Sequence, residues 1–218
     1  MVSPQNEDPY VYPGTDILRN KLNLRDADAL AAEEIRKTGA RLAELRAKPL
    51  RGAFDLRHLR AIHHYIFKDL YRWAGELRTV DIEKGSYFAW TPFLQPVLQD
   101  LFEKLQKEKH LQSLDQDTTV YRLAHYLGEL NAVHPFREGN GRTQREFVRE
   151  LALQAGYTIR WAPVTREAML AASVENFQTA RPDSFYHLLR DITRPATPVE
   201  RAVSYRPITF SLSRSRSR

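Results

Sequence analysis

The chain has 218 residues, of which 42% are hydrophobic and 28% charged, a composition typical of a soluble globular protein with one main domain. It contains no cysteine, which excludes disulfide bonds, thiolate catalysis and cysteine-ligated zinc. No apolar run is long enough to span a membrane, and residues 1–8 lack the basic and apolar regions of a secretory signal. We therefore expect a cytoplasmic protein without a membrane partner, and delivery into another cell stays open.

The net charge of +6 is concentrated near the C-terminal end. Residues 194–218 contain six arginines and one glutamate, which leaves a net charge of only +1 for residues 1–193. A nearly neutral body argues against a nucleic-acid-binding domain surface. Residues 213–218 read Ser-Arg-Ser-Arg-Ser-Arg, so we expect residues 194–218 to be a disordered, basic, low-complexity tail.

Helical periodicity dominates the rest of the chain. Pro49 stops the first predicted helix, Asp55 caps the second, and Gly156 ends the helix that begins near Asn140. In chain order, the predicted helices span about residues 26–48, 55–71, 96–109, 117–133, 140–155, 165–179 and 183–193.

Residues 77–89 break this pattern. Val80 and Ile82 alternate with Asp81 and Glu83, and a Lys84-Gly85-Ser86 turn follows before two aromatic residues. Alternation around a turn of this kind is typical of a β-hairpin. The sequence thus predicts a mainly α domain with one hairpin, at about residues 79–90.

The segment His134-Pro135-Phe136-Arg137-Glu138-Gly139-Asn140-Gly141-Arg142-Thr143-Gln144-Arg145 joins the helix at 117–133 to the next one. Gly139 and Gly141 allow backbone N–H groups to approach an anion, and the following helix directs the positive end of its dipole to the same place. Two cations in the first turns of a helix, Arg142 and Arg145, oppose that dipole unless an anion bridges them. The segment therefore predicts a phosphate site, against the alternative of an ordinary glycine-rich turn.

Two further residues of this segment suggest chemistry. Glu138 offers the hard oxygen that magnesium prefers when phosphates supply its other ligands, although a carboxylate there could also serve the helix dipole. His134 could accept a proton from an incoming hydroxyl, or it could simply cap the preceding helix. Phe136 is expected to anchor the loop in the core. Together these residues indicate a nucleotide polyphosphate, bound with magnesium and attacked by a hydroxyl.

The segment matches the Fic motif, His-x-Phe-x-Asp/Glu-Gly-Asn-Gly-Arg-x-x-Arg, at every specified position. The chain resembles Fic domains over residues 10–193, including the segment 62–78 before the hairpin and the hairpin itself, which the family calls the flap. This resemblance implies a Fic-type helical domain over residues 1–193, with the flap beside the active site. Residues 8–22 resemble the start of bacterial Fic toxins that work with small antitoxins.

By resemblance, the protein would be an adenylyltransferase that transfers AMP from ATP to a Ser, Thr or Tyr hydroxyl of a target protein. His134 would be the catalytic base, and Glu138 would bind Mg²⁺. Backbone groups would hold the α- and β-phosphates, Arg145 would reach the γ-phosphate, and the flap would dock the target as an added strand. The residues implied in nucleotide binding are Lys84, Gly85, Glu138, Gly139, Asn140, Gly141, Arg142 and Arg145.

Many Fic proteins are silenced by a Ser/Thr-x-x-x-Glu-Gly/Asn helix whose glutamate pairs with the second motif arginine, here Arg145. In this chain Glu-Gly occurs only at 138–139, inside the loop, and Glu-Asn only at 175–176, where Ala171 takes the Ser/Thr position. The resemblance therefore implies a toxin that is active alone and inhibited by a separate antitoxin. Type II topoisomerase subunits, of DNA gyrase or topoisomerase IV, are the implied targets.

Two alternatives remain. Fic enzymes that transfer other groups, such as phosphate or phosphocholine, depart from the Gly-Asn-Gly-Arg sequence that this loop retains. A silent nucleotide- or nucleic-acid-binding module usually lacks the histidine or asparagine of the motif, and both His134 and Asn140 are present. His63 and His64 are expected in core or surface roles, and the adenine pocket should draw on the helix after Thr165.

Overall fold

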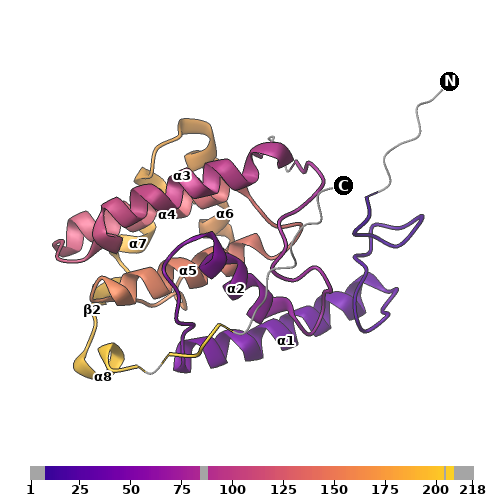
Figure 1. The fold of residues 1–218 in the computed structure, drawn as a ribbon, viewed down its shortest axis with the longest axis horizontal. Coiled ribbons are helices and arrows are strands. Elements are labelled where there is room, and N and C mark those ends of the chain that lie inside the picture. The colour runs from indigo at the N-terminus through magenta and orange to yellow at the C-terminus, as the bar shows by residue number, and fades with distance from the viewer. Residues whose placement is uncertain (1–7, 84–87, 204, 209–218) are drawn as a thin grey trace.

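The computed structural model describes residues 8–83, 88–203 and 205–208, which contain eight α-helices, two short strands and the 3₁₀ helices Thr91–Phe93 and Lys109–Leu111 (Figure 1). Their bounds are α1 Ala27–Ala47, α2 Leu56–Phe67, α3 Leu94–Lys107, α4 Gln116–Val133, α5 Asn140–Gln154, β1 Tyr157–Ile159, α6 Arg166–Thr179, α7 Asp183–Arg190, β2 Thr193–Pro195 and α8 Pro198–Arg201. The predicted mainly α fold is confirmed. In this part of the chain, no helix combines the length and the apolarity needed to span a membrane.

Helices α4 and α5 form the centre of the domain. They pack against each other, α2 packs on α5, and α3, α6 and α7 pack on α4 (Figure 1). The predicted apolar stripe of α4 is buried throughout, from Val120 to Val133. Helix α1 lies alongside α2 at the edge of the domain. Since the two central helices follow each other in the chain, the short loop between them is held between two helices that pack against each other.

Several predicted helix ends are confirmed to within a residue, and others differ: α3 spans Leu94–Lys107 and α7 ends at Arg190. The Asp55 carboxylate accepts the His58 N–H at 2.8 Å at the start of α2, and Gly156 follows α5 with a φ of 95°. Helix α4 begins at Gln116, one residue before the predicted start at 117, and Asp115 caps it by accepting the Thr118 N–H at 3.0 Å.

Helix α2 ends at Phe67, although the apolar pattern predicted helix to residue 71. The N–H groups of Leu70 and Tyr71 both turn back to the Phe67 carbonyl. Both side chains are nevertheless fully buried. The tight turn places both side chains in the core. The apolar pattern of the sequence therefore extends beyond the end of the helix.

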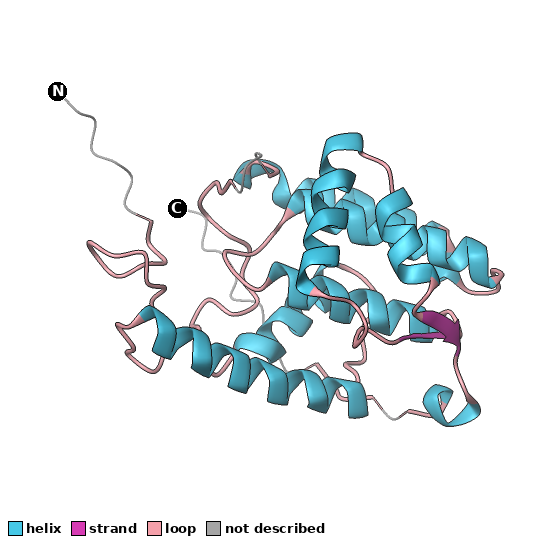
Figure 2. Ribbon diagram, turned by 180° about the vertical axis from the view of Figure 1, so that it is seen from behind, coloured by secondary structure: helices cyan, strands magenta, loops and turns pink. Residues whose placement is uncertain are grey.

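The only sheet in the described residues was not predicted. Strands β1 and β2 pair antiparallel, with Tyr157 opposite Pro195 and Ile159 opposite Thr193 (Figure 2). Three-residue strands are too short to show alternation, and their partners are far apart in sequence. Of the predicted hairpin, residues 79–83 and 88–90 belong to neither strand. Residues 84–87, which include Lys84 and Gly85, lie outside the described residues.

The prediction of a disordered tail from residue 194 is wrong for its first part. Arg194 lies in β2 and forms an ion pair with Glu200 at 2.8 Å, and Thr197 and Glu200 form a capping box at the start of α8. Further on, Arg206 pairs with the segment around Leu50 through backbone hydrogen bonds of 2.7 and 2.8 Å. The prediction of disorder rests on the charge and low complexity of the segment, which do not show that these arginines have partners in the folded domain. Residues 209–218 lie outside the described residues.

The cap of α2 gives a direct test of the helix boundary. We expect Asp55→Ala to lower the free energy of unfolding by about 1 kcal/mol, because the His58 N–H loses its acceptor. Asp55→Asn retains an acceptor at the same place and should unfold nearly as the parent does. Chemical denaturation followed by circular dichroism measures both, and equal losses in the two variants would contradict the role of the cap.

Candidate active site

The loop between α4 and α5 turns on left-handed backbone at both of its ends. His134, the C-cap of α4, has a φ of 48° and donates its N–H to the Leu130 carbonyl at 3.0 Å. Gly139, the N-cap of α5, has a φ of 82°. The ring of Phe67 lies where a Cβ atom on Gly139 would be, only 2.1 Å away. Glycine is therefore required at 139 by both backbone conformation and space.

Asn140 fixes the shape of this loop. Its side-chain oxygen accepts the Phe136 N–H at 2.9 Å, and its Nδ2 donates to the Phe136 carbonyl at 2.6 Å. Both residues are buried, which confirms Phe136 as the anchor of the loop. Because the Asn140 amide is used inside the loop, any contact of this residue with a phosphate would come from its backbone.

His63 supports the loop from α2. Its Nδ1 accepts the Gly75 N–H at 2.7 Å, so its Nε2 carries the proton and donates to the Glu138 carbonyl at 3.0 Å. The ring is fully buried and stacks on Phe136, with centroids 3.9 Å apart. Burial lowers the pKa of His63 to about 3, so the ring stays neutral. The predicted core role is confirmed, whereas the contact with Glu138 has no signal in the sequence.

Arg78 ties the flap region to the end of α4. Its buried guanidinium donates to the carbonyls of His134 at 2.9 Å, Val80 at 2.8 Å and Ala89. Val80 and Ala89 lie on either side of the predicted hairpin turn. One buried cation thus holds both sides of this segment against the candidate base, and sequence reasoning assigned Arg78 no such role.

The start of α5 leaves hydrogen-bond donors for an anion. The backbone N–H groups of Asn140, Gly141 and Arg142 have no acceptor among the described residues. The Arg145 guanidinium likewise has no acidic partner within that part of the chain. Burial, together with the nearby charge of Arg142, lowers the pKa of Arg145. A half-buried cation beside unpaired N–H groups at a helix start is the arrangement that binds phosphate.

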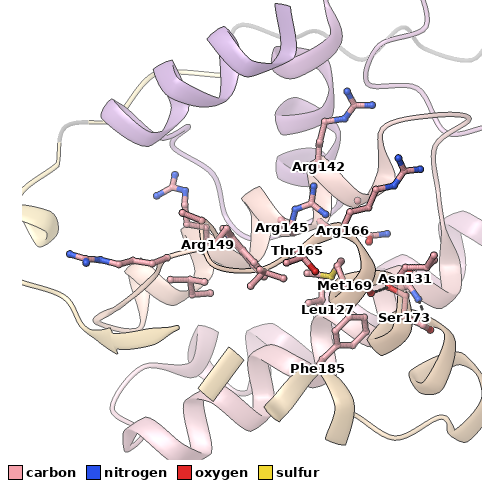
Figure 3. A pocket seen from close by; sticks show the side chains of 18 of the residues that line it. Leu127, Asn131, Arg142, Arg145, Arg149, Thr165, Arg166, Met169, Ser173 and Phe185 are labelled. Atoms are coloured by element: carbon pink, nitrogen blue, oxygen red, sulfur yellow. Dashed lines mark hydrogen bonds between the residues drawn. The ribbon is translucent and has the colours of Figure 1, made fainter. Parts of the chain in front are cut away.

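Arg142 is placed differently from Arg145. Its Nη2 forms ion pairs with Glu34 and, at 3.4 Å, with Glu138, and its Nη1 donates to the Thr38 hydroxyl at 3.2 Å. Figure 3 shows the side chain extending away from Arg145. The positive charge of Arg142 is therefore shared with two carboxylates before any ligand binds.

Glu138 has one oxygen engaged and one available. Its Oε1 accepts the Gly139 N–H at 2.8 Å and faces Arg142, while its Oε2 has no partner among the described residues. In those residues no three His, Asp or Glu side chains gather as a metal site. A cation here would have one protein carboxylate and the phosphates of a ligand, which is how magnesium is commonly held. Glu138 fits that requirement.

A large cleft opens beside the loop, with a volume of about 1520 Å³. His134, Gly141, Arg142 and Arg145 line one part of it. Leu127, Met169 and Phe185 form an apolar part, where Asn131 donates to the Ser173 carbonyl at 3.5 Å (Figure 3). Among the described residues that line the cleft are six arginines and one acidic residue, Glu200. Such a cleft suits a ligand with an aromatic base and a polyanionic chain, and α6, the helix after Thr165, contributes Met169 to the apolar part.

The His134 ring lies at the edge of this cleft. Its Nδ1 lies 3.3 Å from the Asn131 carbonyl, which can only accept, so the proton resides on Nδ1 and Nε2 is the basic nitrogen. The ring stacks on Phe88 with centroids 3.9 Å apart, and Phe88 meets Phe177 of α6 edge-on at 5.9 Å. The flap region and α6 together fix the plane of the imidazole.

Comparison with known proteins identifies the family to which this chain belongs. The Fic/DOC family model matches residues 53–152. The chain is 42% identical over 173 residues to "Protein adenylyltransferase VbhT" of Bartonella schoenbuchensis, which covers 79% of this chain but 36% of that protein. It is 41% identical over 166 residues to "Probable protein adenylyltransferase Fic" of Escherichia coli, with 75% of this chain and 82% of that protein covered.

Solved structures show the same fold with nucleotides bound. The N-terminal Fic domain of a VirB-translocated Bep effector protein of Bartonella quintana, with bound ADP, superimposes with a TM-score of 0.82 at 31% identity. That match covers 86% of this chain and 95% of the other. The BepC protein of Bartonella tribocorum, with bound AMPPNP, has a TM-score of 0.82 at 27% identity and covers 89% of this chain and 100% of that one.

The two loop glycines should respond in opposite ways to alanine. Gly139→Ala forces a left-handed alanine and a Cβ onto the Phe67 ring, so we expect it to lower the free energy of unfolding by about 1–3 kcal/mol. At Gly141 a Cβ meets only the Arg145 side chain, at 3.3 Å, in the first helical turn. Gly141→Ala should leave stability unchanged or raise it slightly. Denaturant titration of both variants checks this, and equal effects would refute the requirement for glycine at 139.

Proposed function

Because the chain belongs to the Fic/DOC family, we propose that it is a protein adenylyltransferase that transfers AMP from ATP to a hydroxyl side chain of a target protein. One observation carries the proposal. His134 lines a cleft that also contains the start of α5 and Arg145, whose backbone N–H groups and guanidinium respectively have no acceptor among the described residues. A proton acceptor beside a phosphate site is the arrangement that nucleotidyl transfer requires.

The cleft suggests how ATP lies in it. The adenine occupies the apolar part beside Leu127, Met169 and Phe185, between α4, α6 and α7. The α- and β-phosphates meet the backbone N–H groups of Asn140 and Gly141, and the γ-phosphate meets Arg145. Lys84 and Gly85, which lie outside the described residues, would border the nucleotide by family resemblance.

The reaction is an in-line displacement at the α-phosphorus. His134 Nε2 takes the proton of the acceptor hydroxyl as its oxygen attacks, the bond from the α-phosphorus to the bridging oxygen breaks, and pyrophosphate leaves. Magnesium, held by Glu138 and the phosphates, would neutralise charge that develops on the leaving group. The protein contributes position and charge: Phe88 and Asn131 fix the imidazole, and α5 directs its N-terminus at the phosphates.

The partners of this activity form a second part of the proposal. The absence of a Ser/Thr-x-x-x-Glu-Gly/Asn sequence, and of an acidic partner for Arg145 in the described residues, support a separate antitoxin that supplies the inhibitory glutamate. By analogy with bacterial Fic toxins, the acceptor is a Ser, Thr or Tyr of DNA gyrase or topoisomerase IV, modified in the bacterial cytoplasm. Relatives described as VirB-translocated effectors support delivery into another cell as the alternative.

Mass spectrometry of lysate proteins tests the activity. We expect the purified chain, with magnesium and ATP but no partner, to add AMP to a hydroxyl side chain. His134→Ala should abolish the transfer and leave ATP binding intact, because only the proton acceptor is lost. Addition of phosphate or another group would contradict AMP transfer and indicate an enzyme that transfers that group. No modification by a chain that binds ATP would favour a silent nucleotide-binding module.

Arg145 is expected to contribute mainly to nucleotide binding. Arg145→Ala should weaken ATP binding about tenfold to a hundredfold, the range for losing a charged hydrogen bond. Arg46→Ala is the matched control, because it removes the same charge from the lining of the same cleft. Arg46 lies about 18 Å along α1 from Glu34, the residue of α1 that contacts the motif at Arg142. Calorimetric titration measures both variants. Equal losses would show that the cleft attracts ATP only by its total charge.

A further inference from the structure

Helix α1 brings a glutamate and a threonine, one helical turn apart, to the first arginine of the motif. Glu34 Oε1 forms an ion pair with Arg142 Nη2, and the Thr38 hydroxyl accepts from Arg142 Nη1 at 3.2 Å. Thr38 in turn donates to the Glu34 carbonyl at 2.7 Å. The other Glu34 oxygen accepts the hydroxyl of Tyr71, a residue buried in the core. The Glu34 carboxylate is therefore fixed from both sides.

The same nitrogen of Arg142 also faces Glu138. Arg142 Nη2 lies 3.4 Å from Glu138 Oε1, which is a looser contact than the one it makes with Glu34. The Glu34 and Arg142 side chains are only 16% and 21% exposed, so solvent screens their interaction weakly. Two carboxylates thus compete for one guanidinium, and the geometry favours Glu34.

We propose that Glu34 is a positioning residue that draws Arg142 into the shorter of its two ion pairs, limits the pairing of Arg142 with Glu138 to the looser contact of 3.4 Å, and thereby keeps the Glu138 carboxylate available to the divalent cation of the bound nucleotide. This inference rests on the proposed function, because it concerns the cation that accompanies ATP in the same cleft. The pairing of Glu34 with Arg142 neutralises both charges and leaves the negative charge of Glu138 for the cation. Without the charge of Glu34, Arg142 closes on Glu138, and a cation must displace a guanidinium to bind.

The test separates nucleotide binding from cation binding. Glu34→Gln removes the charge but retains the shape and an acceptor for Tyr71. Binding of a fluorescent, non-hydrolysable ATP analogue to the full chain is measured in EDTA and then during a MgCl₂ titration. We expect the magnesium concentration for half-maximal effect to rise about three- to tenfold, as for loss of a moderately strong ion pair. The affinity of the variant for the ATP analogue in EDTA should be unchanged or higher, since one of the two carboxylates that neutralise Arg142 has lost its charge.

The neighbouring Glu33→Gln is the matched control. Glu33 lies on the same helix and, within the described part of the chain, forms its ion pair with Arg36, at 2.8 Å, so this variant makes the same charge change and should titrate as the parent does. Thr38→Val removes the second contact of α1 with Arg142 and should shift the magnesium dependence in the same direction, by less. It also provides the test if Glu34→Gln does not fold.

The remaining outcomes separate this inference from the proposed function. A parent chain that binds no ATP analogue overturns the proposed function itself. A parent chain that binds it with magnesium dependence, beside a Glu34→Gln variant with the same dependence, overturns only the role of Glu34. Equal weakening of binding with and without magnesium also overturns that role, because it would mean that Glu34 holds Arg142 on the phosphates.

Discussion

The pair of hydrogen bonds between the Asn140 side chain and the backbone of Phe136 is the constraint on which the site depends. It closes the loop upon itself, so the first residue of α5 is fixed relative to the segment that follows α4. The N–H groups at the start of α5, which have no acceptor in the part of the chain that the structure describes, are then held in a single direction. A buried amide that forms both of its hydrogen bonds inside a loop stabilises a single loop conformation.

Two further buried polar groups connect this loop to neighbouring segments. His63 holds the Glu138 carbonyl from α2, and Arg78 holds the His134 carbonyl together with the flap region. Each acts on backbone atoms of residues whose side chains are proposed to react or bind. The backbones of His134 and Glu138 are therefore fixed by groups other than their own side chains. This division between supporting and reacting groups is typical of preorganised sites.

The arginines of the cleft differ in their partners, and that difference shapes the electrostatics of the site. Arg149 is paired with Glu146 at 2.6 Å, and Arg142 with Glu34, whereas Arg145 has no acid near it in the described residues. Without these pairings, three guanidinium groups on consecutive turns of α5 would repel one another and oppose the helix dipole. The fold neutralises two of them and leaves the charge of the third to attract an anion.

The sequence by itself determined the helices, most of their caps and the composition of the loop, because these depend on residues within a turn or two of each other. Periodicity located α4 and α5, and the spacing of Gly139, Asn140 and Gly141 indicated an anion site. The tertiary structure alone decided which groups meet: Glu34 with Arg142, His63 with Glu138, and β1 with β2. These partners lie on different elements, and neither residue of a pair shows a local pattern that depends on the other. Two arginines that look equivalent in the sequence therefore acquire different partners only when the fold brings Glu34 of α1 to Arg142.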